Sequence, residues 1–399
     1  MAIWIIEPRD PVIFRDGRPF GSIPGAKAST LPFPFPSTIA GGVRTRAGSN
    51  SQGVFQKDKT EEVKNISVKG PFLVELNKDQ DIHKWLFPTP LDALVLNLDP
   101  ISTEKVKIKK LTPIELPSAA LTDLTIKFAN LSLIGMPSPD PNKPHNEAPR
   151  FWYWEQFSNW LMDAKDNDEV LLAELGHNGP LFESRTHVRI IPQTQTAQEG
   201  VLFQTRGLEF TRLIEPNNCN NPTSLLNLAM ALETNTSLID GITTLGGEQR
   251  MVFWQKSQQI NPFAQCPENI RKQILEKGAC RIVLLTPGYF KDICNPICLQ
   301  NITPNVTNPT LKAVAVSKPQ VISGWDFEHN RPKPTRRLAT AGTVFFLKFE
   351  PKPDVQTIEK WIDSIWMNPI SDDAQSCLDG FGLAVLGTWS GENEKLETT

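Results

Sequence analysis

The pattern of apolar and polar positions at the start of the chain predicts a strand, a loop and a helix. Ala2 to Ile6 is an apolar run of strand length, and a helix is expected over residues 37–48. The prolines at 32, 34 and 36 keep the preceding chain extended, because proline fixes φ and disfavours α geometry in the residue before it. Ser37 stands where an N-cap is expected. Two adjacent glycines inside the helix, at 41 and 42, indicate a close neighbour.

Regular alternation appears at Arg185 to Ile191, where the sequence RTHVRII places polar and apolar residues in turn. This pattern is typical of a half-buried strand. A turn through Gly200 leads to Val201-Leu202-Phe203, so the two segments are predicted to form a β-hairpin with a long loop.

The stretch after the hairpin is expected to hold a strand, a helix and another strand. The first strand ends near Ile214, and a helix is predicted for Ser224 to Glu233 with Thr223 as its cap. Gly246-Gly247 then forms a turn that leads into the next strand.

Residues 49–184 have a less regular pattern and are interpreted as an insertion. Prolines at 137, 139, 141, 144 and 149 end any regular structure there. From Phe151 to about Asp163 the aromatic residues have helical spacing, with Phe157, Trp160 and Leu161 on one face. This face is expected in a core or a partner interface, and the alternative is an exposed cluster that stacks on bases.

The second half repeats the order of the first without the insertion. Asp354 is expected to cap an amphipathic helix that carries Ile358, Trp361 and Ile365. Strands are predicted for Arg281 to Thr286, Ala313 to Asp326, Gly342 to Phe349 and Leu383 to Trp389, with a short helical or irregular piece around 288–300.

These elements predict an α+β fold of two tandem ferredoxin-like domains, each a βαββαβ unit of the RRM-like kind. The first domain is expected to span residues 1–256, with the insertion at about 49–184, and the second residues 257–399. A chain of 399 residues is long enough for two domains of ordinary size.

The placement of arginine changes this picture more than the net charge does. The formal net charge is −3, so any nucleic-acid surface must be local. Twelve of the sixteen arginines fall in four windows, 9–18, 44–46, 185–212 and 331–337. Arginine binds phosphate through two hydrogen bonds and stacks on bases better than lysine does, so this clustering favours localised recognition of nucleic acid. In the first part of the chain these arginines are interleaved with phenylalanines, a mixture that suits single-stranded nucleic acid; the alternative is a solvated loop.

Cysteine usage and hydropathy give weaker indications. A zinc site can be imagined from Cys266, Cys280, Cys294 and Cys298, but the spacing is irregular and free thiols in a reducing compartment are the default. Cys219 and Cys377 complete the six cysteines. No signal peptide precedes Ala2, and no apolar run approaches the roughly 20 residues of a membrane helix. A cytoplasmic protein with no membrane partner is therefore expected.

A glycine-rich segment near the end, Gly380 to Gly387, allows two interpretations. A dinucleotide-binding loop would follow a strand and open a helix, whereas this segment follows a helix and opens a strand. Gly380 can simply end the helix in αL geometry, with Gly382 easing entry to the strand.

The combination of motifs is more specific than any one of them. The chain contains FRDGRPF, PSTIAGGVRT, ESRTHVRI followed by EGVLF, LGGEQR, SGWDF, RRLATAGTVFFLKF and GFGLAVLGTW, in that order. Together these resemble the RAMP superfamily of CRISPR proteins, and within it the two-ferredoxin-domain subunit that caps the 5′ end of the guide RNA in type III-B Cmr effector complexes. The resemblance runs from residue 4 to residue 389 and is weakest in the insertion.

The resemblance implies a non-catalytic RNA-binding subunit in which the glycine-rich segment lies against RNA. We expect no cofactor and no metal. Such a subunit would hold the repeat-derived 5′ tag of the guide RNA and dock against the large signalling subunit and the first backbone RAMP subunit. The RNA-binding candidates, chosen for their position in the resembling segments, are Arg15, Arg18, Arg44, Arg46, Arg185, His187, Arg189, Arg336, Arg337, Gly380 and Gly382.

A related activity is the main alternative, because some RAMP proteins cleave precursor RNA with a histidine as general acid or base. Of the five histidines, only His187 is a plausible candidate. It alternates with Arg185 and Arg189, so the three are expected to share one face of the strand. That arrangement suits a phosphate-binding surface as well as a cleavage site, and no partner residue is marked by its spacing.

Overall fold

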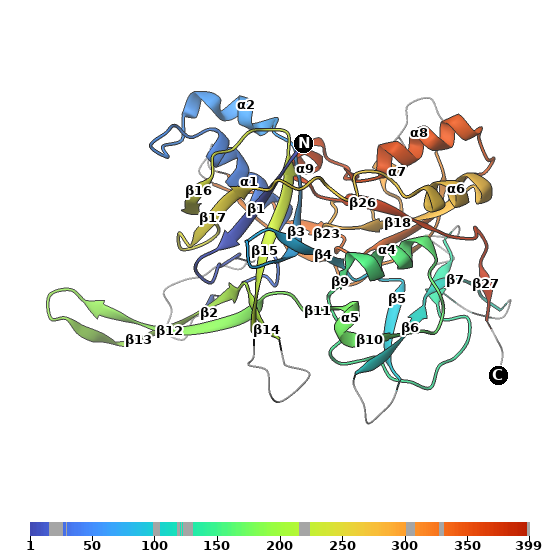
Figure 1. The fold of residues 1–399 in the computed structure, drawn as a ribbon, viewed down its shortest axis with the longest axis horizontal. Helices are drawn as coiled ribbons and strands as arrows, with labels where there is room; N and C mark the ends of the chain where they lie inside the picture. The colour runs from blue at the N-terminus through green and yellow to red at the C-terminus, as the bar shows by residue number, and fades with distance from the viewer. Residues whose placement is uncertain are drawn as a thin grey trace. The chain divides into compact units, whose positions relative to one another are not determined.

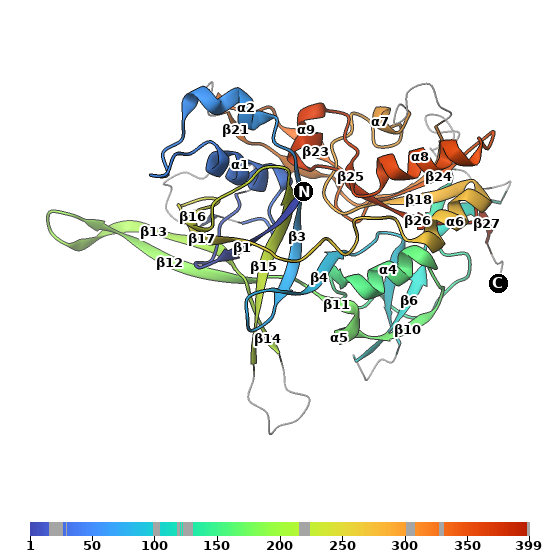
Figure 2. The ribbon, with the colours of Figure 1, turned by 45° about the horizontal axis from the view of Figure 1, so that its top comes forward.

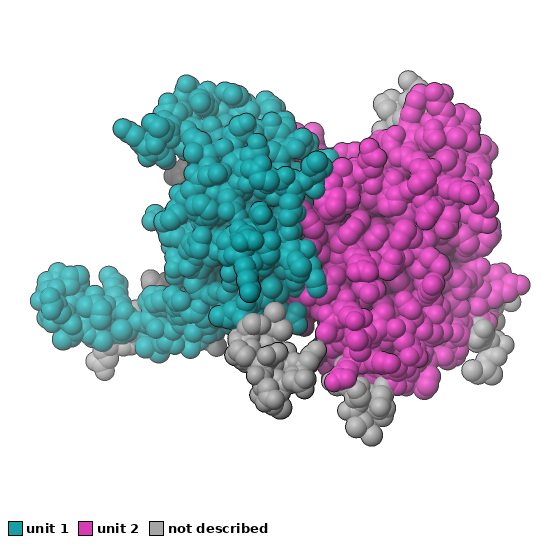
Figure 3. All heavy atoms as spheres, in the orientation of Figure 1, with its two compact units in different colours: residues 1–84, 179–260, 321–337 teal, residues 85–178, 261–320, 338–399 magenta. Residues whose placement is uncertain are grey.

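The computed structural model describes residues 1–15, 27–28, 30–98, 104–117, 120, 122, 131–214, 224–300, 308–326 and 331–396 (Figure 1). The chain has an α+β fold that is rich in sheet and has few helices. It separates into two compact units (Figure 3). Unit 1 contains residues 1–84, 179–260 and 321–337, and unit 2 contains residues 85–178, 261–320 and 338–399. No helix in the described part of the chain is long and apolar enough to cross a membrane.

The core of unit 1 is an antiparallel sheet in which the strand order is β3-β15-β1-β17-β16, with β14 also paired to β15. The predicted first strand is confirmed as β1, and the strand after the Gly246-Gly247 turn is confirmed as β17. The bounds are β1 Ala2–Pro8, β3 Val68–Leu76, β14 Thr211–Ile214, β15 Ser224–Thr234, β16 Gly241–Thr244 and β17 Met251–Lys256.

The prediction of a helix at Ser224 to Glu233 is wrong, because this segment is the strand β15. It is hydrogen-bonded on both edges, with Ala231 opposite Ile5 of β1 and Met230 opposite Leu73 of β3. From Leu228 onward its side chains are buried on both faces. A continuous apolar run of this kind cannot be assigned by periodicity, and pairing with two strands outweighs the helix propensity of leucine, alanine and methionine. Its expected cap, Thr223, lies outside the described residues.

The predicted helix at 37–48 is confirmed as α1, Pro36–Ala47. Its N-cap is Phe35 and no side chain caps it, so the expected role of Ser37 is wrong: the helix begins one residue earlier, with Pro36 at its first turn. Gly42 has the close neighbour that the double glycine indicated. A β-carbon there would lie 2.9 Å from Leu245 Cδ1, whereas one at Gly41 would meet nothing within 4 Å. A short 3-10 turn, η1 Lys57–Lys59, and the helix α2 Thr60–Lys64 follow.

The predicted hairpin is confirmed and is longer than expected. It consists of β12, Leu181–Ile191, and β13, Thr196–Glu209, and a third short strand, β2, Lys27–Ala28, runs parallel to β13. The turn lies at residues 192–195, so the expected turn through Gly200 is wrong; that residue falls within β13. The hairpin projects from the rest of its unit in both ribbon views (Figures 1 and 2).

Unit 2 contains a second antiparallel sheet with the order β19-β24-β18-β26-β25. Its strands are β18 Ala279–Leu284, β19 Thr310–Ala315, β24 Val344–Lys348, β25 Asn368–Pro369 and β26 Leu383–Thr388. The helices are α6 Glu268–Lys277, α7 Ile297–Gln300, α8 Val355–Ile365 and α9 Ala374–Asp379. The predicted cap of α8 is confirmed, because the Asp354 side chain accepts a hydrogen bond from the Thr357 amide at 2.9 Å.

The prediction of one strand from Ala313 to Asp326 is wrong. The chain forms β19, then β20 Gln320–Ile322 and β21 Trp325–Asp326, which belong to three different ladders. Pro319 explains the first break, because proline has no amide hydrogen to give to a ladder. Two further short strands follow, β22 Arg331–Pro332 and β23 Arg336–Leu338.

Residues 85–178, most of the predicted insertion, belong to unit 2 and contribute strands to the ladders β10-β6-β5, β27-β7-β8 and β11-β9-β4. The tryptophan-rich segment starts with a short strand, and its helix α4 begins at Trp154. Phe157, Trp160 and Leu161 are buried, which confirms the core interpretation. The bounds are β4 Ile82–Pro88, β5 Ala93–Asn97, β6 Lys105–Lys110, β7 Thr112–Glu115, β8 Leu133–Gly135, β9 Phe151–Tyr153, α4 Trp154–Met162, β10 Asp168–Leu171, α5 Leu172–Leu175, β11 Gly176–His177 and β27 Glu394–Lys395.

A buried ion pair ties this segment to the second sheet. Arg281 of β18 donates to the Asp92 carboxylate and to the Trp160 carbonyl, and its Nε lies 3.1 Å from the Thr388 carbonyl. Trp160 Nε1 donates to the same carboxylate at 2.9 Å. Gly387 makes room for the guanidinium, since a β-carbon there would lie 2.9 Å from Arg281 Nε.

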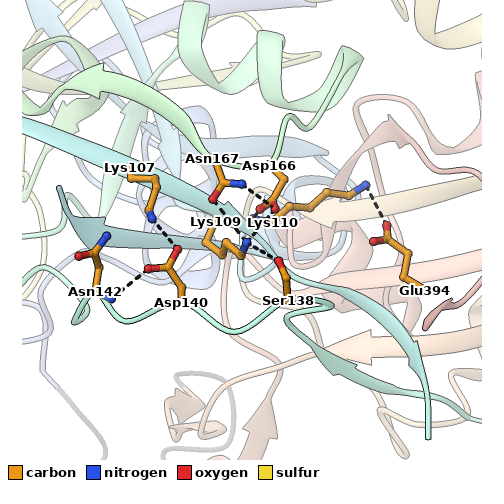
Figure 4. Close-up of polar contacts among 9 residues, drawn as sticks. All are labelled: Lys107, Lys109, Lys110, Ser138, Asp140, Asn142, Asp166, Asn167 and Glu394. Atoms are coloured by element: carbon orange, nitrogen blue, oxygen red, sulfur yellow. Dashed lines mark hydrogen bonds and ion pairs between the residues drawn. The ribbon is translucent and has the colours of Figure 1, made fainter. Parts of the chain in front are cut away.

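Three of the four lysines of strand β6 are paired with neighbouring carboxylates (Figure 4). Lys109, 2% exposed, contacts Asp166 at 2.8 Å, and Lys107 contacts Asp140 at 2.5 Å. Lys110 lies 3.6 Å from Glu394. These lysines hold loops against the strand, so the basic sequence KVKIKK is not evidence for an RNA surface.

Candidate nucleic-acid interface

The hairpin brings one of the predicted arginines, the predicted histidine and an aromatic ring onto one face. Arg185 is opposite Thr205 and His187 is opposite Phe203 in the ladder between β12 and β13. Alternate residues of a strand point to the same side, so these four side chains share a surface, called here the recognition face. The prediction that Arg185 and His187 lie together is confirmed.

His187 and Phe203 form a stacked pair on the recognition face. Their ring centroids are 5.1 Å apart and the rings are within 16° of parallel. His187 Nε2 also lies 2.8 Å from the Thr205 hydroxyl, which fixes the orientation of the imidazole. Both rings are partly exposed. A fixed, partly exposed aromatic pair beside a guanidinium is chemically suited to stacking on an unpaired base.

Arg189 lies at an irregularity of the hairpin. The register of the ladder shifts between Val188 and Ile190, so strand alternation no longer determines which way Arg189 points. The expectation that Arg189 shares a face with the other two is therefore not supported by the register. Its side chain is exposed and makes no hydrogen bond or ion pair within the part of the chain that the structure describes.

Arg15 lies close to the base of the hairpin. It forms a bridge with Thr30, and β2, two residues before Thr30, pairs with Gln204 and Thr205 of β13. Val12 and Leu208 exchange backbone hydrogen bonds at 3.0 and 2.8 Å. The start of the FRDG motif and the hairpin motif are thus adjacent, although about 170 residues separate them in the sequence. Arg18 lies outside the described residues.

The LGGEQR motif meets the same segment. The Gly247 amide donates to the Ile13 carbonyl at 2.7 Å. Gly246 has a φ of 76°, and a β-carbon there would lie 2.6 Å from the Ile13 carbonyl oxygen. Only glycine fits this turn without moving the backbone. Three of the motifs that resemble the RAMP superfamily therefore come together in unit 1.

Arg44 and Arg46 bond to carbonyls of their own unit. Arg44 Nη2 lies 3.0 Å from the Ile66 carbonyl, and Arg46 Nε lies 2.5 Å from the Ile239 carbonyl. Burial lowers the pKa of Arg46, and its guanidinium lies 5.9 Å from the ring centre of Trp254. These contacts give both residues a structural role in joining α1 to its neighbours.

Arg336 and Arg337 lie on β23, which belongs to a separate two-stranded ladder with β20. Arg337 is exposed and Arg336 is partly exposed. The structure does not pair this ladder with the hairpin strands.

The glycine loop is buried in unit 2. Gly380 has a φ of 92° and ends α9, as the helix-ending interpretation predicts. The amides of Gly380 and Gly382 donate to the carbonyls of Cys377 and Pro287 at 3.1 and 2.8 Å. The amides of Phe381 and Leu383 are bonded too: they donate to the Ser376 carbonyl and the Thr286 hydroxyl. A loop whose amides are already bonded is poorly suited to binding phosphate, which favours the structural interpretation.

Arg206 and Phe203 were not singled out from the sequence. The guanidinium of Arg206 lies 3.8 Å above the ring centre of Phe182, on the opposite face of the hairpin from His187. The face on which each of these two residues lies follows from the residue opposite it on β12. That assignment requires the register of the two strands, which the sequence does not show.

The described residues give little support for a metal site or a reactive thiol. No group of three or more histidine, cysteine, aspartate or glutamate side chains there could hold a metal ion. The described cysteines are free thiols, and burial raises the pKa of Cys266 to about 12. Cys219 lies outside the described residues.

Comparison with known proteins gives one family. A family model described as CRISPR-associated protein (Cas_Cmr3) matches residues 4–389. No curated protein sequence matches the chain. A chain in the cryo-EM structure of the type III-B Cmr-beta bound to cognate target RNA and AMPPnP, state 1, is 17% identical, with a TM-score of 0.42 and 86% of each chain covered. A chain in the cryo-EM structure of the type III-B Cmr-beta bound to cognate target RNA is 14% identical, with a TM-score of 0.46 and coverage of 99% of this chain and 98% of the other.

Proposed function

The chain belongs to the Cas_Cmr3 family of CRISPR-associated proteins, and from this premise we propose that it is an RNA-binding subunit of a type III-B Cmr effector complex. In this role it holds the repeat-derived 5′ tag of the guide RNA and joins the large signalling subunit to the first backbone RAMP subunit. As part of such a complex it acts in the cytoplasm. The observation that carries the proposal is the family match, which runs from residue 4 to residue 389.

The order of strands supports two tandem ferredoxin-like units as the framework for this function. In a βαββαβ unit of this kind the sheet has the order 4-1-3-2. The run β17-β1-β15-β3 in unit 1 and the run β26-β18-β24-β19 in unit 2 both have that order. Unit 1 departs from the pattern in one respect, because residues 235–250 hold β16 and turns in place of a second helix.

The recognition face supports the hairpin as the place where RNA binds. Arg185 supplies charge, and the stacked His187 and Phe203 supply an aromatic platform for an unpaired base. Arg15, in the segment next to the hairpin, and the exposed Arg189 are further candidates for phosphate contact. The buried glycine loop, Arg44 and Arg46 are assigned to structure and are left out of this surface.

We also propose that the chain does not cleave RNA. General acid–base cleavage needs a second group that acts on the other oxygen. Within the described part of the chain, His187 contacts the Thr205 hydroxyl and the Phe203 ring, neither of which has the acidity or basicity for that role.

The proposal is tested by measuring RNA binding with the purified full-length chain. An RNA that carries a repeat-derived 5′ tag is compared with one of the same length and composition in which the tag is scrambled. Tighter binding of the tagged RNA, and co-purification with the large subunit and the first backbone subunit, are the expected results. Equal affinity for the two RNAs would overturn the assignment to the tag.

A further inference from the structure

Arg185 of the recognition face is held by a carboxylate of its own strand. Glu183, two residues earlier on β12, accepts a hydrogen bond from Arg185 Nε. The two side chains are 46% and 35% exposed, for Arg185 and Glu183 respectively. Strand alternation places the two side chains on the same face. The guanidinium of Arg185 is therefore already paired with a carboxylate in the absence of RNA.

Two further carboxylates surround this pair. Glu209 is on the partner strand β13, and Asp10 precedes Pro11, which packs over Gly207 so closely that a β-carbon there would lie 2.9 Å from the proline ring. Burial, and then the charge of Glu183, raise the pKa of Glu209, with Asp10 contributing in the same direction. The base of the recognition face is therefore acidic, whereas its outer part carries His187 and Phe203.

We propose that Glu183 competes with RNA for Arg185, so that RNA gains this arginine only when a phosphate replaces the Glu183 carboxylate. The inference rests on the proposed function, since it concerns how the same face engages RNA. It identifies Glu183 as a residue that sets the affinity of the interface without contacting RNA.

The exchange is feasible because both partners are at the surface. An exposed ion pair is weak, and a phosphate offers the guanidinium the same bidentate geometry as a carboxylate. Asp10 and Glu209 stay at the base after the exchange and repel phosphate there. RNA is thereby restricted to the outer part of the face, next to the stacked rings.

The test is a double-mutant cycle of RNA affinity in the full-length chain, with Glu183→Gln, Arg185→Ala and the double variant. Glu183→Gln is expected to tighten binding of the tagged RNA by about threefold, because the exposed pair no longer has to be broken. The gain is expected to disappear when residue 185 is alanine. The salt dependence of binding should also become steeper in Glu183→Gln, since an uncompensated arginine releases more counterions.

A matched control removes the same charge elsewhere in unit 1. Glu61→Gln on α2 breaks an exposed pair with Lys64, 2.8 Å apart, and should leave RNA affinity unchanged. An equal gain from Glu183→Gln with and without Arg185 would mean that Glu183 merely repels RNA and would overturn the exchange. Unchanged affinity in Glu183→Gln would also overturn it. If the wild-type chain binds no RNA at all, the proposed function fails, which is a distinct outcome.

Discussion

At the scale of single residues, Gly382 shows that a glycine in a motif can be required by the backbone conformation and not by contact with a ligand. Its φ is 76°, and a β-carbon there would lie 2.9 Å from both the Ile370 carbonyl oxygen and the Ser371 hydroxyl. Gly382→Ala is therefore expected to lower the free energy of unfolding by about 2 kcal/mol, with the αL strain and the contact both contributing. Gly380→Ala should lose about 1 kcal/mol, because its φ of 92° lies in the αL region. Thermal unfolding checks both values.

The RNA affinity of the folded glycine variants distinguishes structure from contact. Because the loop is buried and its amides are bonded, affinity should be unchanged in both. Gly41→Ala provides a control within an exposed part of α1, where a β-carbon meets nothing. It should stabilise the chain by about 0.5–1 kcal/mol. A loss of RNA affinity in Gly382→Ala without a loss of stability would return the loop to the interface.

His187 offers a second prediction at this scale. His187→Ala removes one ring of the stacked pair and should weaken RNA binding by about 1–3 kcal/mol if one base stacks there. His187→Phe keeps a ring over Phe203 and should retain most of the affinity. Fluorescence anisotropy with labelled tagged RNA measures both variants. Site-specific cleavage by the wild type that both variants lose would instead establish the nuclease alternative.

At the scale of elements, local patterns with a clear period were predictable and continuous apolar runs were not. The hairpin followed from the alternation of RTHVRII, and α8 followed from Asp354 and the spacing of its buried face. β15 could not be distinguished from a helix, because what makes it a strand is its pairing with β1 and β3. The same limit applies to the site. In the sequence, Arg44 is a plausible RNA-binding arginine. Only the fold shows that its guanidinium donates a hydrogen bond to the Ile66 carbonyl.

The ion pair of Arg281 and Asp92 gives a prediction for the elements that it joins. Asp92→Asn leaves the guanidinium charge buried without its partner and should destabilise the chain by about 3–5 kcal/mol. Asp363→Asn is the matched control, because it breaks an exposed pair with Arg271 and should cost less than about 1 kcal/mol. Denaturant unfolding of both variants makes the comparison. Similar small losses would mean that Arg281 finds other acceptors among the carbonyls of α4 and β26.

At the scale of the whole molecule, the distribution of charge limits how RNA can be bound. The net charge is −3, and three of the four lysines of β6 are paired with Asp140, Asp166 and Glu394. A diffuse electrostatic attraction is therefore excluded as the source of affinity. The proposed interface is therefore a local surface on the hairpin, where we expect few phosphates to be contacted.

The salt dependence of RNA affinity tests this description of the molecule. Each phosphate contacted by the hairpin should contribute about −0.7 to the slope of log affinity against log salt concentration. Arg189→Ala removes an exposed arginine and should make the slope shallower by about that amount with little change in stability. Arg46→Ala removes the same charge but breaks bonds to the carbonyls of Ile239 and Gly241, so it should lower the melting temperature and leave the slope unchanged. Equal changes of slope in the two variants would mean that RNA responds to the total charge of the chain, and the interface would then not be confined to the hairpin.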